Sequence, residues 1–233
     1  MRLLANNNNE REYMSDFTWS YSSLKQYQNC PKQYQEIRVL KNYIVKQSEA
    51  MIYGKEVHTA LEEYVRDNKP LAKNYQRFKG MVDSLVNIKG DKYVEYEMAL
   101  RFDRTPCDFH DEDRWVRGIA DLVIVDGDCA FIVDYKTGSK KYPDPKQLRL
   151  MSLMVFSIFP DVQKVKGALF FIMHNSIVEE TYFRKDMDKS WGRFEQPLKR
   201  LEMSYDNDVW QANPTPLCGW CSVDSCEFWK PRR

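Results

Sequence analysis

Two aspartates and one lysine interrupt apolar stretches in the middle of the chain. Asp121 lies in the run WVRGIADLVIVD (115–126), and Asp134 and Lys136 lie near the end of the run CAFIVDYKTG (129–138). The Asp-Gly-Asp segment between the runs predicts a tight hairpin, and side chains two residues apart in a strand share one face. We therefore expect both carboxylates and the lysine to meet in one place on two neighbouring strands.

Such a cluster can bind a divalent cation. Two aspartate oxygens and the carbonyl of Tyr135 form a hard-oxygen ligand set suited to Mg²⁺ or Mn²⁺, and Lys136 can orient a water or neutralise developing phosphate charge. The cation would also offset the cost of burying unpaired carboxylates. The alternative is a structural salt bridge at a sheet end, in which Asp134 or Asp121 pairs with Lys136 or Arg117.

A histidine at helical spacing from a glycine and a glutamate forms a second candidate element. In GKEVHTALEEY, Gly54, His58 and Glu62 recur every four residues and so lie on one helix face. A glycine inside a helix costs about 1 kcal/mol, which indicates a close backbone approach there. A lone histidine is more often a core or surface residue than a ligand. His58 therefore gains weight only together with the aspartates and the lysine.

Taken together, these motifs resemble the RecB-like branch of the PD-(D/E)XK nucleases. The matching segments, in chain order, are CPxxY at 30–34, GxxxHxxLE at 54–62, GxxD at 118–121 and DxK at 134–136. The branch's next motif, a Gln four residues before a Tyr, is matched by Gln147 only, because Met151 replaces the tyrosine. This departure puts the aromatic contact of that segment in doubt and leaves the metal ligands untouched.

The resemblance implies a role for each matched residue. The metal ligands would be His58, Asp121, Asp134 and the backbone carbonyl of Tyr135. The catalytic residues would be Asp121, Asp134, Lys136 and Gln147. Lys136 would serve the hydrolytic water, and Gln147 would position the scissile strand or Lys136. The expected DNA-binding residues are Tyr34, Lys140, Lys141 and Arg149, although aromatic side chains at helical spacing are more often core residues.

The six cysteines are distributed unevenly. Three of them, Cys218, Cys221 and Cys226, fall in CGWCSVDSC, and Cys30 is the natural fourth member. Clustered thiols without a secretory signal are more often metal ligands than disulfides. One cysteine near the start and three near the end is also the arrangement of the AddB-type and CRISPR-associated RecB-like exonucleases. The resemblance thus implies a [4Fe–4S] cluster that joins the chain ends. Zinc on four thiolates and free buried thiols are the alternatives.

The elements that position these residues follow from hydrophobic periodicity. Helices are expected from Ser20 or Ser22 to Pro31, and at 48–67, 74–88, 145–159 and 186–204. Strands are expected at 94–103, 115–126, 129–138, 164–174 and 176–184. Three strands, a helix and two strands predict an α/β fold whose mixed sheet has at least one right-handed crossover. With the resemblance, this becomes a PD-(D/E)XK (restriction-endonuclease-like) mixed β-sheet flanked by helices, with a helical N-terminal part and a Cys-rich C-terminal tail.

We expect one nuclease domain at 18–233, preceded by a flexible arm at 1–17. Its parts would be a helical part at 18–90, a catalytic sheet core at 91–185, and a helix plus cysteine cluster at 186–233. The 233-residue length excludes a helicase-linked nuclease, and the absence of GxxxxGK[ST] indicates no built-in ATP hydrolysis.

Charge and hydropathy narrow the functional class. With 35 basic and 34 acidic residues, the net charge of +1 argues against a protein that coats nucleic acid by bulk electrostatics. Basic segments at 22–46 and 131–150 flank an acidic segment at 95–128, so any grip on DNA is local. No stretch is apolar enough for a membrane span, and the polar start does not resemble a signal peptide, which predicts a cytoplasmic protein without membrane association.

The expected activity is that of a stand-alone, metal-dependent DNA exonuclease that digests DNA ends, with 5′→3′ polarity favoured. It would act in recombination, repair or DNA turnover, in a bacterial cytoplasm or in a host cytoplasm if phage-encoded. Recombination or adaptation proteins are candidate partners. One alternative is a CRISPR adaptation accessory nuclease that trims spacer precursors. The other is a non-catalytic nucleic-acid-binding module with a zinc or iron–sulfur staple.

Overall fold

The structure, a computed structural model, describes residues 18–45, 47–141 and 143–230. The arm expected at 1–17 lies outside the described residues. The chain forms two compact units: the first comprises Met1–Trp19 and Glu49–Trp191, and the second comprises Ser20–Ser48 and Gly192–Arg233. The single nuclease domain expected over 18–233 stays a prediction. Within the described residues, we find no helix that combines the length and the apolar character needed to span a bilayer.

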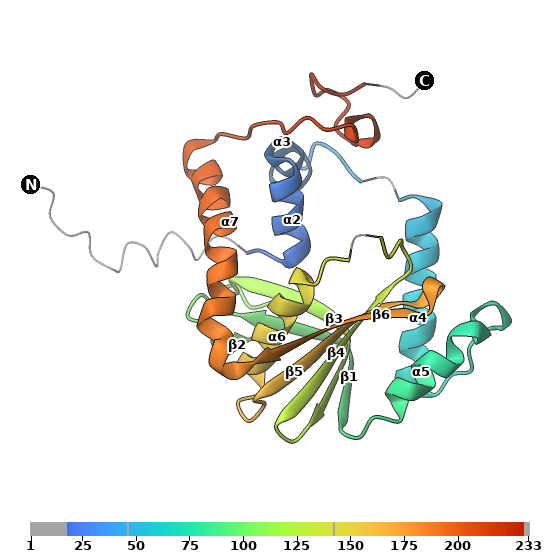
Figure 1. Cartoon of the computed structure of the whole chain (residues 1–233). Helices are drawn as coiled ribbons and strands as arrows, with labels where there is room; N and C mark the ends of the chain where they lie inside the picture. Colours follow the sequence, from blue (N-terminus) through green and yellow to red (C-terminus); the bar gives the residue numbers. More distant parts are fainter. Residues whose placement is uncertain (1–17, 46, 142, 231–233) are drawn as a thin grey trace, which may run out of the picture. The chain divides into compact units, whose positions relative to one another are not determined.

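A mixed sheet of six strands, in the order β2-β1-β3-β4-β5-β6, forms the centre of the first unit (Figure 1). The strands are β1 (Asp91–Leu100), β2 (Pro106–Cys107), β3 (Val116–Asp126), β4 (Cys129–Lys136), β5 (Lys164–Phe171) and β6 (Ser176–Phe183). Strands β4 and β5 are parallel and are connected through α6 (Lys146–Ile158), whereas the other neighbours are antiparallel. The predicted mixed sheet with a crossover is therefore confirmed. Short β2 was not predicted, and the 3₁₀ helix η3 (Ile172–His174) replaces the end of the strand expected at 164–174.

The hairpin between β3 and β4 brings the acidic strands together. Asp126 pairs with Cys129, so the turn consists of Gly127 and Asp128. Gly127 has φ +60°, a backbone conformation that glycine adopts without steric cost. The sequence signal for this turn therefore led to the correct strand pairing.

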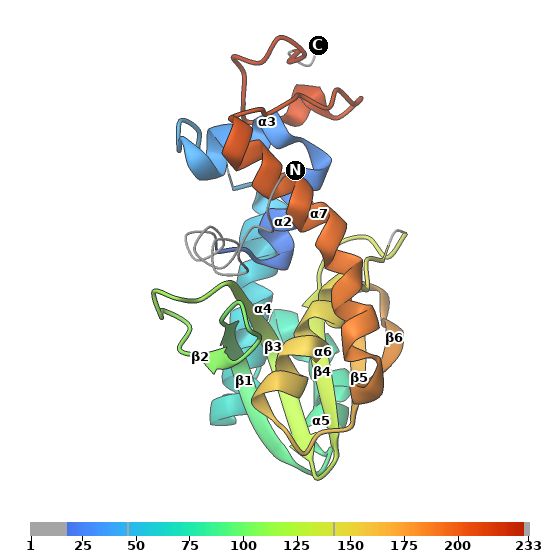
Figure 2. The same cartoon turned by 90° about the vertical axis from the view of Figure 1, so that its left-hand side faces the viewer.

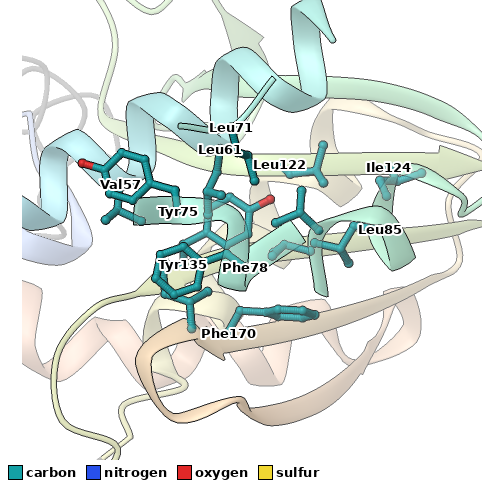
Figure 3. Packing of buried hydrophobic residues seen from close by; sticks show 13 residues of the cluster. Val57, Leu61, Leu71, Tyr75, Phe78, Leu85, Leu122, Ile124, Tyr135 and Phe170 are labelled. Carbon is teal, nitrogen blue, oxygen red and sulfur yellow. The ribbon is translucent and has the colours of Figure 1, made fainter. Parts of the chain in front are cut away.

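Helices α4 (Glu49–Asp67) and α5 (Lys79–Val86) cover one face of the sheet, with the 3₁₀ helix η2 (Lys73–Phe78) just before α5. Val57 and Leu61 of α4 are fully buried in a cluster that also contains Phe78 and Tyr135 (Figure 3). Burial of one such side chain contributes about 1.5–3 kcal/mol. Because Val57 precedes His58 and Tyr135 separates Asp134 from Lys136, this core fixes both parts of the candidate site.

Helix α6 lies on the other face of the sheet (Figure 2). Most of its side chains are buried, among them Leu148 and Met154. Gly167 of β5 permits close packing, since a Cβ there would lie 3.1 Å from the Cβ of Leu148. Gly118 of β3 faces the same helix, because its Cβ would lie 3.5 Å from Met154 Sδ. Gly167 therefore lets α6 lie close to the sheet, whereas a Cβ at Gly118 would make an ordinary van der Waals contact.

The second unit starts with α2 (Tyr21–Asn29), which Ser20 caps in a reciprocal capping box with Ser23. Pro31 ends this helix as predicted, but it also begins α3 (Pro31–Tyr34), which continues as the π-helix η1 (Gln35–Val39). Proline fits the first turn of a helix because its missing N–H would be unpaired there. The sequence analysis predicts a helix end at Pro31 and does not predict the helical residues that follow it.

The C-terminal part of the chain begins with the 3₁₀ helix η4 (Arg184–Asp186) and α7 (Met187–Asn207). Residues Met187–Trp191 of α7 belong to the first unit and the remainder to the second. After α7 the chain has little regular structure apart from the 3₁₀ helix η5 (Cys218–Trp220). The helix expected at 186–204 is confirmed.

Candidate active site

The ladder between β3 and β4 ends immediately before the two aspartates. Its last pair is Leu122 with Val133, so Asp121 and Asp134 are the next residues on their strands. Asp121 Oδ2 accepts a hydrogen bond from the backbone N–H of Tyr135 at 2.5 Å. The carboxylate thus takes the place of a strand partner where the two strands separate, and it lies beside the peptide that follows Asp134.

Asp134, Lys136 and Gln147 form a closed triangle. Gln147 Nε2 donates to Asp134 Oδ1 at 2.7 Å, and Lys136 Nζ donates to Gln147 Oε1 at 3.1 Å. Lys136 Nζ also lies 2.5 Å from Asp134 Oδ2. The period-two expectation that Asp134 and Lys136 share a face matches this contact, and the salt bridge considered as the alternative is itself present. Asp134 is 4% exposed, and its Oδ2 has no hydrogen bond of good geometry among the described residues, which leaves a lone pair for a cation.

His58, Glu95 and Asp121 form a second group. His58 Nδ1 lies 3.2 Å from Asp121 Oδ1, and one ligand atom of each of the three residues lies within 4.8 Å of the others. The His58 ring also packs edge-on against the ring of Tyr135, with centroids 5.9 Å apart. Imidazole and carboxylate ligands in such a cluster suit a divalent cation. Sequence reasoning missed Glu95, which lies between Val94 and Tyr96 within β1.

The side-chain alternation of β1 and β3 breaks at this group. Tyr93 and Tyr96 both pack against Phe159, although residues three apart on a regular strand face opposite sides. Glu95, between them, has φ +47° and is skipped in the ladder opposite Asp121. A left-handed non-glycine residue is strained, and such strain concentrates at functional sites. The distortion is what lets Glu95 join the histidine and the aspartate.

In β3 the same change of face occurs at Asp121. Gly118 faces α6, whereas Leu122, an even number of residues further on, belongs to the cluster beneath α4. Regular alternation would place both on one face. The strand therefore rotates between them, and Asp121 can reach His58 on α4 as well as Tyr135 on β4.

Burial and mutual charge perturb the titration of this cluster. Burial raises the pKa of Glu95 to about 7, with Asp121 and Glu62 adding repulsion. Burial also raises the pKa of Asp134, against the attraction of Lys136. Burial alone would lower the pKa of His58, but its hydrogen bond to Asp121 and the nearby carboxylates raise it overall. Crowded carboxylates that resist ionisation are those that a bound cation stabilises most.

The cluster opens into a cavity of about 800 Å³. Its walls come from α4, from β1 and β3 at Glu95 and Asp121, from Thr137 and Gly138 after β4, and from Met173 of η3. Gly54 lies in the α4 wall, and a Cβ there would be only 2.9 Å from Thr137 Oγ1. The close approach inferred from the helical glycine is therefore made by the segment that directly follows Lys136.

The family profile of the PD-(D/E)XK nuclease superfamily matches residues 18–226. The chain belongs to the PD-(D/E)XK nuclease superfamily. Membership in this superfamily supports a metal-dependent nuclease, a hydrolase that acts on DNA, and the cluster of His58, Glu95 and Asp121 could hold a metal ion.

Two solved structures have a fold similar to that of this chain. A protein from Eubacterium rectale described as a candidate exonuclease matches with a TM-score of 0.54 and 14% identity, covering 100% of this chain and 97% of the other. The protein SSO0001 matches with a TM-score of 0.50 and 15% identity, covering 91% and 87%. No curated protein matches the chain. At these identities the likeness concerns the fold alone.

Three of the four expected DNA-binding residues of this PD-(D/E)XK protein lie in the first unit. Lys140 and Lys141 are exposed in the segment that connects β4 to α6. Arg149 on α6 lies over the ring of Tyr182 and 3.8 Å from Glu180.

Tyr34 lies in the second unit and is buried, contrary to the expectation that it binds DNA. It is 3% exposed and stacks on Trp210 with centroids 5.9 Å apart. Its hydroxyl lies 3.2 Å from that of Tyr205. Both the ring and the hydroxyl are therefore used in an aromatic core, and the structure makes Tyr34 a packing residue.

The four clustered cysteines line one pocket of the second unit; they are Cys30, Cys218, Cys221 and Cys226. Three of the sulfur atoms have N–H donors nearby. Gln33 Nε2 donates to Cys221 Sγ at 3.3 Å, and the amides of Asn213 and Thr215 lie 3.4 Å from Cys30 Sγ and 3.2 Å from Cys218 Sγ, respectively. Donors arranged around sulfur stabilise thiolates that carry metal centres.

Proposed function

We propose that the protein is a divalent-metal-dependent DNA exonuclease that hydrolyses phosphodiester bonds at DNA ends, with 5′→3′ polarity. The single observation that carries the proposal is the convergence of two groups on adjoining strand positions. His58, Glu95 and Asp121 gather their ligand atoms within 4.8 Å, and Asp134 holds Lys136 at 2.5 Å. The Eubacterium rectale protein of the same fold, described as a candidate exonuclease, supports the choice of end digestion.

The donor set fits Mg²⁺ or Mn²⁺. We assign the cation to His58, Asp121, Asp134 and the carbonyl of Tyr135, and we add Glu95 to this set. The fit rests on the crowded carboxylates of Glu95 and Asp134, whose ionisation burial opposes. The bound cation supplies Lewis acidity for an attacking water and positive charge for the phosphate.

Lys136 and Gln147 complete the proposed chemistry. The ammonium of Lys136 is held by Asp134 and Gln147, so its position is fixed before substrate arrives. It neutralises charge on the phosphate and orients the water. Gln147 donates a hydrogen bond to Asp134 and accepts one from Lys136, which makes it a positioning residue for both. Met151, which replaces the expected tyrosine one turn further along α6, is 4% exposed and packs in the core.

End-labelled DNA tests the nuclease assignment. Single- and double-stranded linear DNA with a 5′ or 3′ label should be shortened from the end in Mg²⁺ or Mn²⁺ and not in EDTA, and closed circular DNA should persist. Asp134→Asn and Lys136→Ala should each reduce the rate by about a hundredfold to a thousandfold, the scale of loss when one electrostatic contact to the transition state is removed. Asp161→Asn, at an exposed loop position, is the matched control. Activity that survives in either site variant would refute the assignment.

For the cysteines we propose a [4Fe–4S] cluster. Cys30, Cys218, Cys221 and Cys226 line one pocket although Cys30 is distant from the others in sequence, which supports a metal group that all four share. The N–H donors of Gln33, Asn213 and Thr215 support thiolate sulfur.

Absorption tests the cluster. Anaerobically purified protein should show a band near ~400 nm that bleaches on reduction, as cysteine-bound iron–sulfur centres do. Iron and sulfide analysis should give four of each per chain. A colourless protein that contains stoichiometric zinc would overturn the cluster and would leave the nuclease assignment intact.

A further inference from the structure

The cavity beside the candidate metal ligands has a second, chemically different wall. Met51 and Tyr53 near the start of α4 line it together with Met173 of η3. Met51 is 52% exposed and Met173 is 38% exposed, so both residues are accessible from solvent. Met51 and His58 are seven residues apart, two helical turns or about 10 Å along one face of α4. The cavity therefore runs from an acidic, imidazole-bearing end to an end rich in thioether and aromatic surface.

The apolar wall is held together by one guanidinium. Arg77 Nη2 donates to Tyr53 Oη at 2.9 Å and lies 3.3 Å from Met173 Sδ. Tyr53 Oη also lies 3.8 Å from the same sulfur atom. The Tyr53 ring packs on Tyr75, with centroids 6.4 Å apart. Side chains from α4 and η3 are thus fixed beside each other, and this wall is preorganised for a flat ligand.

The charged residues that line the cavity also bear on which ligand it fits. Among the residues that line the cavity, Lys55 is the one lysine or arginine, and it is exposed. A nucleotide has the matching division: a charged diester at one end and a flat, apolar, polarisable base at the other. Thioether and aromatic side chains are surfaces on which bases pack without regard to sequence.

We propose that Met51, Tyr53 and Met173 form a nucleobase subsite, which takes an unpaired base of a DNA single strand while its phosphodiester lies at His58, Glu95 and Asp121. This inference rests on the proposed nuclease function and names the form of DNA that the site accepts. A base inside a duplex is stacked and paired, and freeing it costs a few kcal/mol. An unpaired end therefore enters the cavity more readily than a blunt end, and Lys55 contacts the adjoining phosphate.

Fluorescence of 2-aminopurine at the end of an oligonucleotide tests the subsite. The full-length protein is titrated in Ca²⁺, which is chosen to occupy the metal site without supporting cleavage, against a single-stranded 12-mer and against the same end in a blunt hairpin. The wild type should bind the single strand more tightly and change its emission. Met51→Ala/Met173→Ala should weaken this binding about tenfold, the scale of losing one base-stacking contact. Met173→Phe should retain the affinity, because an aromatic ring offers an equivalent surface.

The matched control is Met203→Ala, since Met203 is 61% exposed and lies outside the cavity. Circular dichroism verifies that each variant is folded. Unchanged single-strand affinity in the double variant, or a blunt end bound as tightly as the single strand, would overturn the subsite. Hydrolysis of the base-free diester bis(p-nitrophenyl) phosphate by the wild type in Mn²⁺ tests the nuclease separately. Absence of this hydrolysis would count against the proposed function. The contact with the base is tested separately, by the binding titration alone.

Discussion

The two candidate metal centres are built in opposite ways. The carboxylate site sits on neighbouring strands whose ladders continue up to Asp121 and Asp134, with fully buried Val57 and Leu61 beneath it. The cysteine centre sits in a segment with little regular structure, where Val223 is the one buried side chain between residues 211 and 230. The first site is therefore preorganised by the fold, whereas the second has few protein contacts to hold it. We therefore expect the group proposed at the thiolates to supply much of the order of that segment.

Removal of the thiolates should produce the largest change in stability. We expect Cys218→Ser/Cys221→Ser to abolish the ~400 nm band and to lower the thermal midpoint by about 10 °C or more, because ligand binding supplies folding free energy where a core is small. Calorimetry and limited proteolysis of the C-terminal segment measure both effects. Cys129→Ser is the control, since Cys129 lies in the first unit on β4. An unchanged midpoint would show that the segment is ordered without a bound group.

The carboxylate site should instead depend on its core. Phe78 is 2% exposed in the cluster beneath the sheet, and Phe78→Ala should destabilise the protein by about 3–5 kcal/mol because it loses apolar burial and leaves a cavity. Urea unfolding measures the loss. Phe183→Ala, at a ring that is 42% exposed, should cost less than about 1 kcal/mol. A loss of similar size in both variants would contradict a site supported by this core.

The sequence allowed prediction of those parts of the site whose geometry depends on short-range residue spacing. Strand period two brought Asp134 next to Lys136, and the Gly127 turn set the pairing of β3 with β4. Spacing on a helix could also place His58 and Gly54 on one face. These features depend on a few adjacent residues, so their geometry is encoded locally.

The place of Glu95 in the site could not be predicted from such local spacing. Its approach to Asp121 requires that the alternation of two paired strands breaks at the same level, with φ +47° at Glu95. Residue types give no sign of this, because glutamate is not a residue that favours the left-handed region. The prediction that Tyr34 binds DNA failed for a similar reason, because the burial of Tyr34 depends on Tyr205 and Trp210, which are distant in sequence. Tertiary contacts decided both cases.

Ionisation of Glu95 should give a smaller effect that depends on pH. Its folded pKa of about 7 lies above the ordinary 4.5, so the folded state binds the proton more tightly than the unfolded state. Stability without metal should therefore fall as pH rises from about 4.5 to 7. Glu95→Gln should remove that fall, so that in EDTA the variant is more stable than the wild type at pH 8 and gains nothing from this source at pH 4. Thermal midpoints at both pH values measure the difference.

Glu97→Gln is the matched control, on the same strand at an exposed position. With saturating Mn²⁺ at pH 8, the wild type should instead be more stable than Glu95→Gln. The cation stabilises ionised Glu95 in the wild type, whereas the variant lacks this ligand. A Glu95→Gln variant that keeps full Mn²⁺ affinity would remove Glu95 from the proposed ligand set.

The smallest effect on stability is expected at the contact between α4 and the segment after Lys136. In Gly54→Ala, alanine gains about 1 kcal/mol of helix propensity, but its Cβ would lie 2.9 Å from Thr137 Oγ1, and either the hydroxyl or the segment must move. Stability should change little, while cleavage slows several-fold because Thr137 adjoins Lys136, the proposed catalytic lysine. Thr137→Ala removes the clashing atom, so Gly54→Ala/Thr137→Ala should recover the rate of Thr137→Ala alone. A double-mutant cycle on the cleavage rate measures this coupling. Additive losses would mean that Gly54 serves the helix itself, whereas recovery would show that the rigid core positions the lysine through this contact.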